Sequence, residues 1–272
     1  MKCNNCFRHC DIKDGFYGFC RGRKNLNNTI ISDNYGYCTS LELDPIEKKP
    51  FKNFYPGSMI LSYGSYGCNL KCPFCQNYEI SQYTLKNESK YISPNELVNT
   101  ALGLIKRGNI GIAFTYNEPL VSYEYVRDTS KLAKEKGLKT VLVTNGCFSD
   151  LVIDEVLPYI DAMNIDLKGF TKDFYDFVGG DLEMVKHFIV RANEKCHVEL
   201  TTLIIPGKND DEKIFLEEVK WISSINKDMP LHITRYFPRY KMDRGEPTEI
   251  ASLEKLAKIA KQYLNFVYIG NV

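Results

Sequence analysis

Short apolar runs alternate with helical segments from residue 59 to the end of the chain, and this alternation limits the fold more than any other feature. Strands are predicted at 59–64, 110–115, 139–144, 161–167, 198–205 and 230–236, with a short final strand at 266–269. Helices are predicted between them, at 94–106, 120–136, 149–157, 181–195, 210–227 and 249–263. These strand–helix units predict an α/β fold with a parallel sheet covered by helices. Periodicity leaves open whether the sheet is doubly wound or a curved partial barrel.

Two segments precede this pattern. Residues 1–24 are rich in cysteine, and residues 25–58 carry several prolines and little helical pattern. The second segment is predicted to be irregular, with a few extended pieces. We therefore expect a cysteine-rich, metal-binding head with its lead-in over 1–58, and the α/β domain over 59–272.

Charge and composition exclude several classes of partner. The chain has 272 residues and a formal net charge of +1, and this near-neutral charge argues against a nucleic-acid partner. No apolar run is long enough to span a membrane, and the N-terminal residues do not resemble a secretory leader. Ten cysteines without such a leader indicate reduced thiols and metal sites rather than disulfides. We expect a cytoplasmic, oxygen-poor setting.

Cys68, Cys72 and Cys75 form a C-x3-C-x2-C motif directly after the first predicted strand. A [4Fe–4S] cluster normally takes four cysteine thiolates, so three ligands leave one iron without a protein ligand. An open metal position is where a substrate or cofactor can bind. The spacing therefore indicates a cluster that takes part in chemistry. The alternative is a zinc loop that is completed by one remote ligand.

Polar residues follow the next predicted strands. Asn117 and Glu118 come after the second, Asn145 after the third, and Asp166 and Lys168 after the fourth. Glu118 suits an ammonium group as a carboxylate acceptor, or is an acid favoured near a helix N-terminus. Asp166 and Lys168 point to the same side of an extended strand and are alternatively a surface ion pair. Asn145 alone is weak, because Asn-Gly is an ordinary turn.

Four further cysteines, Cys3, Cys6, Cys10 and Cys20, stand within eighteen residues of the head. Four thiolates can close a tetrahedral zinc site, and an auxiliary iron–sulfur cluster needs the same set. A short head with little apolar content needs a metal to fold. Both metals stay open at this point, and so does an unligated, flexible head. The remaining cysteines are expected to be unligated, although one of them follows the third strand and could approach the site: Cys38, Cys147 and Cys196.

The cysteine motif, with an aromatic residue before its last cysteine, resembles the signature loop of radical S-adenosylmethionine (SAM) enzymes. Tyr116-Asn117-Glu118-Pro119 is similar to their Gly-Gly-Glu-Pro motif but replaces both glycines. Asp166-Leu167-Lys168 resembles the Asp-x-Lys motif of glycyl-radical-enzyme activases, the pyruvate formate-lyase activating enzymes. The resemblance implies a (β/α)6 partial barrel with a small cysteine-rich N-terminal extension.

Further segments resemble one subgroup, the AmmeMemoRadiSam-system radical SAM enzymes, over essentially the whole chain. They include residues 44–50, 56–58, 75–77, 114–119 and 268–272.

The resemblance implies a role for each candidate residue. Cys68, Cys72 and Cys75 would hold a [4Fe–4S] cluster whose open iron is chelated by SAM. The residues that would contact SAM are Phe74, against adenine, with Asn117, Glu118, Asn145, Asp166, Lys168 and Arg235. Arg235 and the nearby His232 are alternatively satisfied residues of the barrel. No single catalytic residue is predicted.

The implied reaction is reductive cleavage of SAM to methionine and a 5′-deoxyadenosyl radical, which abstracts hydrogen from a protein, a peptide or a small molecule. The expected partners are SAM, an electron donor of the flavodoxin or ferredoxin kind and, if the activase resemblance extends to the substrate, a partner protein. The alternative is a non-enzymatic iron–sulfur electron-transfer protein or a zinc-dependent binding protein.

Overall fold

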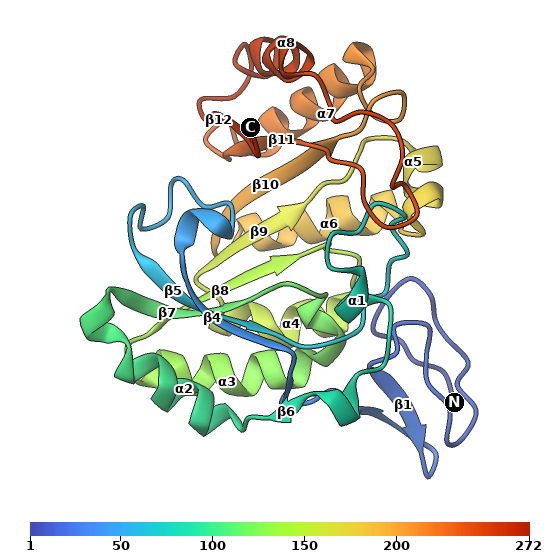
Figure 1. Cartoon of the computed structure of the whole chain (residues 1–272), viewed down its shortest axis with the longest axis vertical. Helices are drawn as coiled ribbons and strands as arrows, with labels where there is room; N and C mark the ends of the chain where they lie inside the picture. Colours follow the sequence, from blue (N-terminus) through green and yellow to red (C-terminus); the bar gives the residue numbers. More distant parts are fainter.

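An open, mostly parallel sheet forms the centre of the computed structural model, which describes residues 1–272 (Figure 1). Its order is β12-β11-β10-β9-β8-β7-β5-β4, and every neighbouring pair is parallel except β4 with β5. The strands are β4 (Ser40–Pro45), β5 (Met59–Gly64), β7 (Asn109–Phe114), β8 (Lys139–Thr144), β9 (Ala162–Asp166), β10 (His197–Ile204), β11 (Leu231–Arg235) and β12 (Val267–Gly270). The predicted α/β fold and its seven strands are confirmed.

Helices follow the parallel strands in the predicted order. The main ones are α2 (Pro94–Gly103), α3 (Tyr123–Glu135), α4 (Asp150–Val156), α6 (Leu182–Asn193), α7 (Glu212–Ile225) and α8 (Ile250–Ala260). Two short helices were not predicted, α1 (Tyr78–Ser81) and α5 (Lys172–Val178), and there are five 3-10 turns at Ile46–Lys48, Lys86–Glu88, Ile105–Arg107, Pro119–Ser122 and Leu157–Tyr159. None of the helices combines the length and apolar character needed to cross a membrane.

The start of α2 shows how local sequence sets an element boundary. The Ser93 hydroxyl accepts from the Glu96 amide at 3.3 Å, and the Glu96 carboxylate accepts from the Ser93 amide at 2.7 Å. This capping box satisfies amide groups that have no partner within the helix. Pro94 at the first helical position needs no such partner, so the chain enters the helix here.

The lead-in is more ordered than the sequence suggested. β1 (Arg23–Leu26) and β2 (Thr29–Ser32) form an antiparallel hairpin, and β3 (Tyr37–Cys38) pairs with β6 (Lys90–Tyr91). β4 adds an antiparallel strand to the edge of the main sheet. The boundary at residue 58 stays a prediction, and the lead-in shares the sheet with the residues that follow it.

After β4 the lead-in crosses the inner face of the sheet. Ile46 and Phe51 are fully buried there against Ile60, Ala113, Val141 and Ala162, which come from four neighbouring strands. The Pro50 carbonyl then accepts from Asn164 Nδ2 at 2.8 Å, and Asn53 Oδ1 accepts from the Tyr268 hydroxyl on β12 at 2.6 Å. One short segment therefore joins the β4 edge to the β12 edge, which requires the sheet to curve around it as a partial barrel does.

A buried carboxyl group on α7 makes the stability of the fold depend on pH. Glu218 is 2% exposed, and burial raises its pKa to about 8. Its partner, the Thr202 hydroxyl, lies 2.6 Å away and is also 3.0 Å from the Leu167 carbonyl. A protonated Glu218 can donate to Thr202 while Thr202 donates to Leu167. The folded protein therefore holds a proton that the unfolded chain releases near its ordinary pKa.

Because the unfolded chain loses this proton first, raising the pH from 5 to 8 favours unfolding. We expect Glu218 to contribute about 2–4 kcal/mol to the fall in the free energy of unfolding over this range, so the fall should be smaller by about that amount in Glu218→Gln. Urea denaturation at several pH values measures it. Glu217→Gln is the matched control, because the Glu217 side chain is 65% exposed on the same helix. Equal falls in wild type and in Glu218→Gln between pH 5 and 8 would show that Glu218 is ionised in the fold.

Candidate active site

A cavity of about 490 Å³ opens at the carboxyl ends of the parallel strands. This volume lies within the range of small-molecule sites, and the edge is where α/β proteins place them. It brings together nine of the ten residues predicted for the cluster and for SAM: Cys68, Cys72, Cys75, Phe74, Asn117, Glu118, Asn145, Asp166 and Lys168. Arg235 does not line it. Residues separated by about one hundred positions in sequence thus share one space.

The cysteine loop forms one wall of this cavity. Cys72 is 7% exposed, and Cys68 and Cys75 are partly buried. The Cys68 sulfur accepts from the Leu70 amide at 3.4 Å and from Asn145 Nδ2 at 3.7 Å. No group of three or more His, Cys, Asp or Glu side chains is arranged to hold a single metal ion. A cluster binds each thiolate to a different iron, so its ligands stand farther apart than those of one zinc ion.

Burial keeps two of these thiols, those of Cys68 and Cys72, protonated until a metal binds. It raises the pKa of Cys72 to about 11, against the opposing effect of nearby Lys168. Burial likewise raises the pKa of Cys68, and the Glu118 charge adds to this rise. Since thiolates are the metal ligands, loading of the loop must release these protons.

Glu118 joins the ends of two strands. Its carboxylate accepts from the Asn145 amide at 2.8 Å, the Thr144 hydroxyl at 2.8 Å and the Leu120 amide at 3.0 Å. The side chain is 2% exposed, and burial raises its pKa to about 7 although these three donors lower it. A carboxylate offers about four acceptor sites, so one remains for a donor in the cavity. Glu118 can therefore position the strand ends and still receive an ammonium group.

Asn117 fastens the cysteine loop to the second strand end. Its Nδ2 donates to the carbonyls of Tyr66 and Gly67, both at 3.1 Å, and its Oδ1 accepts from the Ser65 amide at 3.0 Å. The preceding residue, Tyr116, has φ +73, a left-handed conformation in which side chains are uncommon. Its hydroxyl donates to Asp44 at 2.7 Å, which helps to hold this strained backbone. Tyr116 thus has a backbone conformation typical of glycine, at a position where the similar Gly-Gly-Glu-Pro motif has a glycine.

Asp166 and Lys168 form an ion pair inside the cavity, with 2.9 Å between Lys168 Nζ and Asp166 Oδ2. Burial lowers the pKa of Lys168, but the Asp166 charge, to which Cys72 would add as a thiolate, outweighs burial and the net pKa is raised. The alternative of a surface ion pair is therefore wrong, because the lysine side chain is only 18% exposed. A fixed positive charge stands beside the cysteine loop.

The matching family model is described as the Radical SAM superfamily, and it covers residues 62–219. The chain belongs to the radical SAM superfamily. An uncharacterised protein of Methanocaldococcus jannaschii is 40% identical to it, over 100% of this chain and 81% of the relative. The pyruvate formate-lyase 1-activating enzyme of Escherichia coli K12 is 24% identical over 76% of this chain and 90% of the relative. A domain of the pyruvate-formate lyase-activating enzyme of Bacteroides vulgatus has a similar fold, with TM-score 0.52 and 21% identity over 59% of this chain and 99% of that domain.

Membership of the radical SAM superfamily indicates an enzyme and implies a [4Fe–4S] cluster and SAM. The alternative of a non-enzymatic electron-transfer or zinc-dependent binding protein is therefore not supported. Assignment to the AmmeMemoRadiSam subgroup stays a prediction.

Two residues predicted to contact SAM are placed differently within this radical SAM fold. Phe74 lines the cavity but is 5% exposed, and its ring packs against Phe177 and Phe174 with centroids 6.3 and 6.5 Å apart. Arg235 turns away, since its Nε donates to the Thr248 carbonyl at 2.7 Å and its guanidinium lies over the Phe237 ring. Phe74 thus lines the cavity and also makes ordinary packing contacts. The contacts of Arg235 agree with the alternative interpretation, in which its side chain is satisfied within the barrel.

Asn69 is a positioning residue that the sequence did not reveal. Its side chain accepts from Asn145 Nδ2 at 2.8 Å and donates to the Cys147 carbonyl at 2.9 Å. It therefore ties the cysteine loop of this radical SAM enzyme to the third strand end. No local signal could identify it, because its partners lie more than seventy residues away. Cys147 itself is buried and does not line the cavity.

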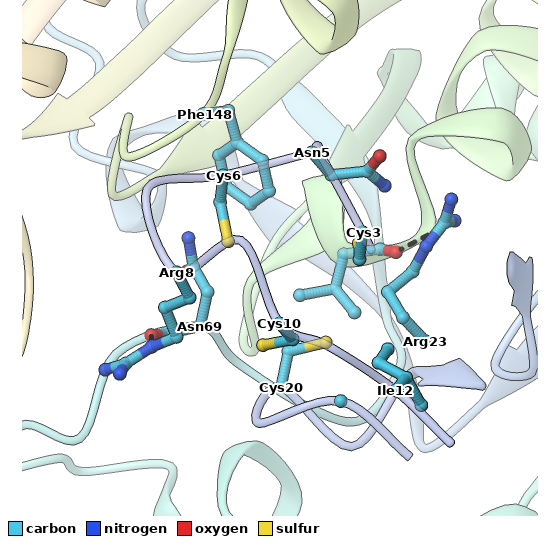
Figure 2. A pocket seen from close by; sticks show the side chains of 12 residues that line it. Cys3, Asn5, Cys6, Arg8, Cys10, Ile12, Cys20, Arg23, Asn69 and Phe148 are labelled. Atoms are coloured by element: carbon cyan, nitrogen blue, oxygen red, sulfur yellow. Dashed lines mark hydrogen bonds between the residues drawn. The ribbon is translucent and has the colours of Figure 1, made fainter. Parts of the chain in front are cut away.

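The head cysteines surround a second, smaller cavity. Cys3, Cys6, Cys10 and Cys20 line a space of about 20 Å³, and Figure 2 shows their side chains around it. Burial raises the pKa of Cys6 to about 12, and the charges of Cys20, Cys3 and Cys10 would add to this rise. The four thiols are thus neighbours in the fold, as a metal site built from these four cysteines requires.

Gly67 marks the contact between the head and the cysteine loop. Its φ is +90, and a Cβ here would lie 2.4 Å from the Cys20 carbonyl oxygen. Gly67→Ala is therefore expected to destabilise the protein by about 2–4 kcal/mol, through backbone strain and this clash. Thermal unfolding measures the effect. Gly57→Ala is the matched control, because Gly57 also has positive φ but an added Cβ meets nothing within 4 Å. Equal losses in the two variants would show that the clash contributes nothing.

Proposed function

We propose that this enzyme cleaves SAM reductively at a [4Fe–4S] cluster held by Cys68, Cys72 and Cys75, and that the resulting radical abstracts hydrogen from a substrate. The observation that carries the proposal is the shared cavity: three thiols face the Glu118 carboxylate and the Asp166–Lys168 pair across one space. Three thiol ligands suit a cluster with one iron left open for SAM.

When bound, the cluster supplies the electron that breaks the C5′–S bond of SAM. The chain supplies position and charge. The remaining acceptor site of Glu118 would accept an N–H of the SAM amino group, and Asn69 and Asn117 hold the loop that carries the three thiols. Lys168 places positive charge beside Cys72, which offsets the negative charge of three thiolates and their cluster.

Asn145 and Asp166 complete the proposed SAM site. Asn145 Nδ2 donates to the Cys68 sulfur, and hydrogen bonds to cluster sulfur ligands are one of the factors that set reduction potential. Asp166 keeps Lys168 in place and lines the same cavity. Phe74 stays a candidate for contact with the adenine of SAM because it lines the large cavity. Arg235 does not line this cavity and is left out of the proposed SAM site.

The substrate proposal rests on the relatives and on the width of the cavity. The E. coli relative is named as an enzyme that activates pyruvate formate-lyase, so an activase-like action on a partner protein is the leading proposal. Lys48 and Lys52 of the lead-in and Asn271 near the C-terminus line the cavity away from the cysteines. These side chains would face the substrate once SAM occupies the region beside the loop. A peptide or a small molecule would reach the same place.

The reaction also needs a one-electron donor. We propose a flavodoxin- or ferredoxin-like protein, because the cluster must be reduced before SAM is cleaved. All ten cysteines are free, which fits a reducing compartment such as the cytoplasm.

The test is an anaerobic assay of iron–sulfur-reconstituted protein with SAM and dithionite. We expect 5′-deoxyadenosine and methionine in equal amounts, measured by mass spectrometry. Deuterium transfer from a labelled substrate into 5′-deoxyadenosine then identifies the substrate that supplies the hydrogen. A reconstituted protein that holds its cluster but leaves SAM intact would contradict the proposed reaction.

A further inference from the structure

The four head cysteines form a second group of thiols that the proposed reaction does not use. They line one cavity together with Arg8 and Arg23, and Figure 2 shows the sulfur atoms arranged around a space rather than gathered at a point. The cavity exceeds the roughly 10–15 Å³ that a water needs, but thiols are weak hydrogen-bond partners for water. Its lining therefore suits a soft metal centre better than a solvent molecule.

The arrangement of the four thiols favours a cluster over one metal ion. A zinc ion needs four thiolates at about 2.3 Å from one point, and no three of these side chains are arranged to hold a single ion. The loop of Cys68, Cys72 and Cys75 shares this property, and its family implies a cluster there. Four thiolates on the four irons of a cubane stand farther apart than four on one zinc. The head has the ligand number of a complete [4Fe–4S] site.

Charge around the head cavity favours an anionic centre. Four thiolates give an iron–sulfur cluster a net negative charge, and two arginines line the cavity. Arg23 is 4% exposed, with Glu124 as its salt-bridge partner at 2.6 Å. Arg8 is held in place by its bonds to the Asn69 carbonyl at 2.6 Å and the Gly179 carbonyl at 2.7 Å. Arg8 is partly buried and has no carboxylate partner, so it places positive charge beside an anionic centre, whereas the charge of Arg23 is balanced by Glu124.

The head touches the proposed cluster site directly. The Cys68 amide donates to the Cys20 carbonyl at 3.2 Å, so one hydrogen bond joins the backbones of a head thiol and an active-site thiol. Asn69 lines the head cavity, while its neighbours Cys68 and Leu70 line the large cavity. Residues 68–70 thus contribute to the lining of both cavities.

We propose that Cys3, Cys6, Cys10 and Cys20 hold a second [4Fe–4S] cluster, which exchanges electrons with the active-site cluster through the Cys20–Cys68 contact. The exchange part rests on the proposed function, whereas the metal site does not. One electron from a flavodoxin- or ferredoxin-class donor reduces the head cluster and then passes to the active-site cluster, which leaves the head cluster oxidised again. No bond is made or broken, and no proton is required.

Metal analysis of three anaerobically reconstituted proteins tests the site. We expect about eight iron atoms in wild type, about four in the triple variant Cys68→Ala, Cys72→Ala, Cys75→Ala, and about four in the double variant Cys6→Ser, Cys10→Ser. Cys196→Ser should match wild type, because Cys196 belongs to neither group. The triple variant leaves the head intact, so it tests the site even if the double variant fails to fold.

Zinc without iron in the triple variant, or no metal at all, would overturn the second cluster. A failure of the proposed active-site cluster gives a different result. If wild type holds only the head cluster, wild type and the triple variant will hold equal amounts of iron. Electron paramagnetic resonance (EPR) of protein reduced with titanium(III) citrate tests the contact. We expect the wild-type spectrum to be broader than the sum of the two variant spectra, since two nearby paramagnetic clusters interact. A wild-type spectrum equal to that sum would overturn the electron exchange.

Discussion

Cys72→Ala is expected to abolish SAM cleavage, with 5′-deoxyadenosine falling at least about a hundredfold to the level of a no-enzyme sample. Cys72 is buried at the wall of the large cavity and lies beside Lys168. Its loss leaves two thiols for a cluster that needs three protein ligands and SAM. Anaerobic assay with dithionite, together with iron content, measures the effect. We expect the active-site iron and the activity to disappear together.

Cys196→Ala is the matched control for this prediction. Cys196 lies at the other end of the sheet from the cysteine loop, just before β10, and its thiol donates to the Ala192 carbonyl at 3.4 Å. It should keep wild-type activity. Full SAM cleavage by Cys72→Ala would show that the cluster is bound elsewhere.

Glu118→Gln has the second-largest expected effect, a loss of SAM affinity of about tenfold to a hundredfold. A hydrogen bond from the amino group of SAM to a charged carboxylate contributes about 1.5–3 kcal/mol, and the Gln amide removes the charge while keeping the shape. Equilibrium dialysis of labelled SAM against reconstituted, oxidised protein measures the affinity.

The same carboxylate predicts a pH dependence. Its pKa is raised to about 7 without SAM, and only the ionised form offers a charged acceptor to the SAM amino group. Wild-type affinity should therefore fall as the pH drops from 8 to 6, and the fall should be smaller in Glu118→Gln. Thr144→Val is the control, because it removes one hydrogen bond to Glu118 and leaves the charge. Equal losses in the two variants would mean that Glu118 acts only by bracing the strand ends.

The strands and main helices could be predicted because their signals are local. Apolar runs of strand length, and caps such as Ser93 with Glu96, depend on residues that are close in sequence. The large cavity could be predicted for a similar reason, since parallel strands bring their carboxyl ends to one edge. Cys68, Glu118 and Asp166 each follow a strand, so topology alone places them together.

Features that depend on distant contacts could not be predicted. The path of Ile46 and Phe51 across the inner face of the sheet is set by strands, one of which lies more than one hundred residues away. Arg235 stands at a strand end like the others, but its side chain finds the Thr248 carbonyl instead of the cavity. Sequence position fixes where a backbone goes, whereas the direction of a long side chain depends on the partners it meets.

The most direct test of the central claim is EPR of the reduced protein with and without SAM that carries ¹⁵N in its amino group. We expect one cluster signal to shift when SAM is added and to acquire a magnetic coupling to the labelled nitrogen, because the open iron beside Cys68, Cys72 and Cys75 binds the amino group. Cluster signals that are unchanged by SAM would contradict the proposed SAM site, because they would show that no iron in the large cavity is open to SAM.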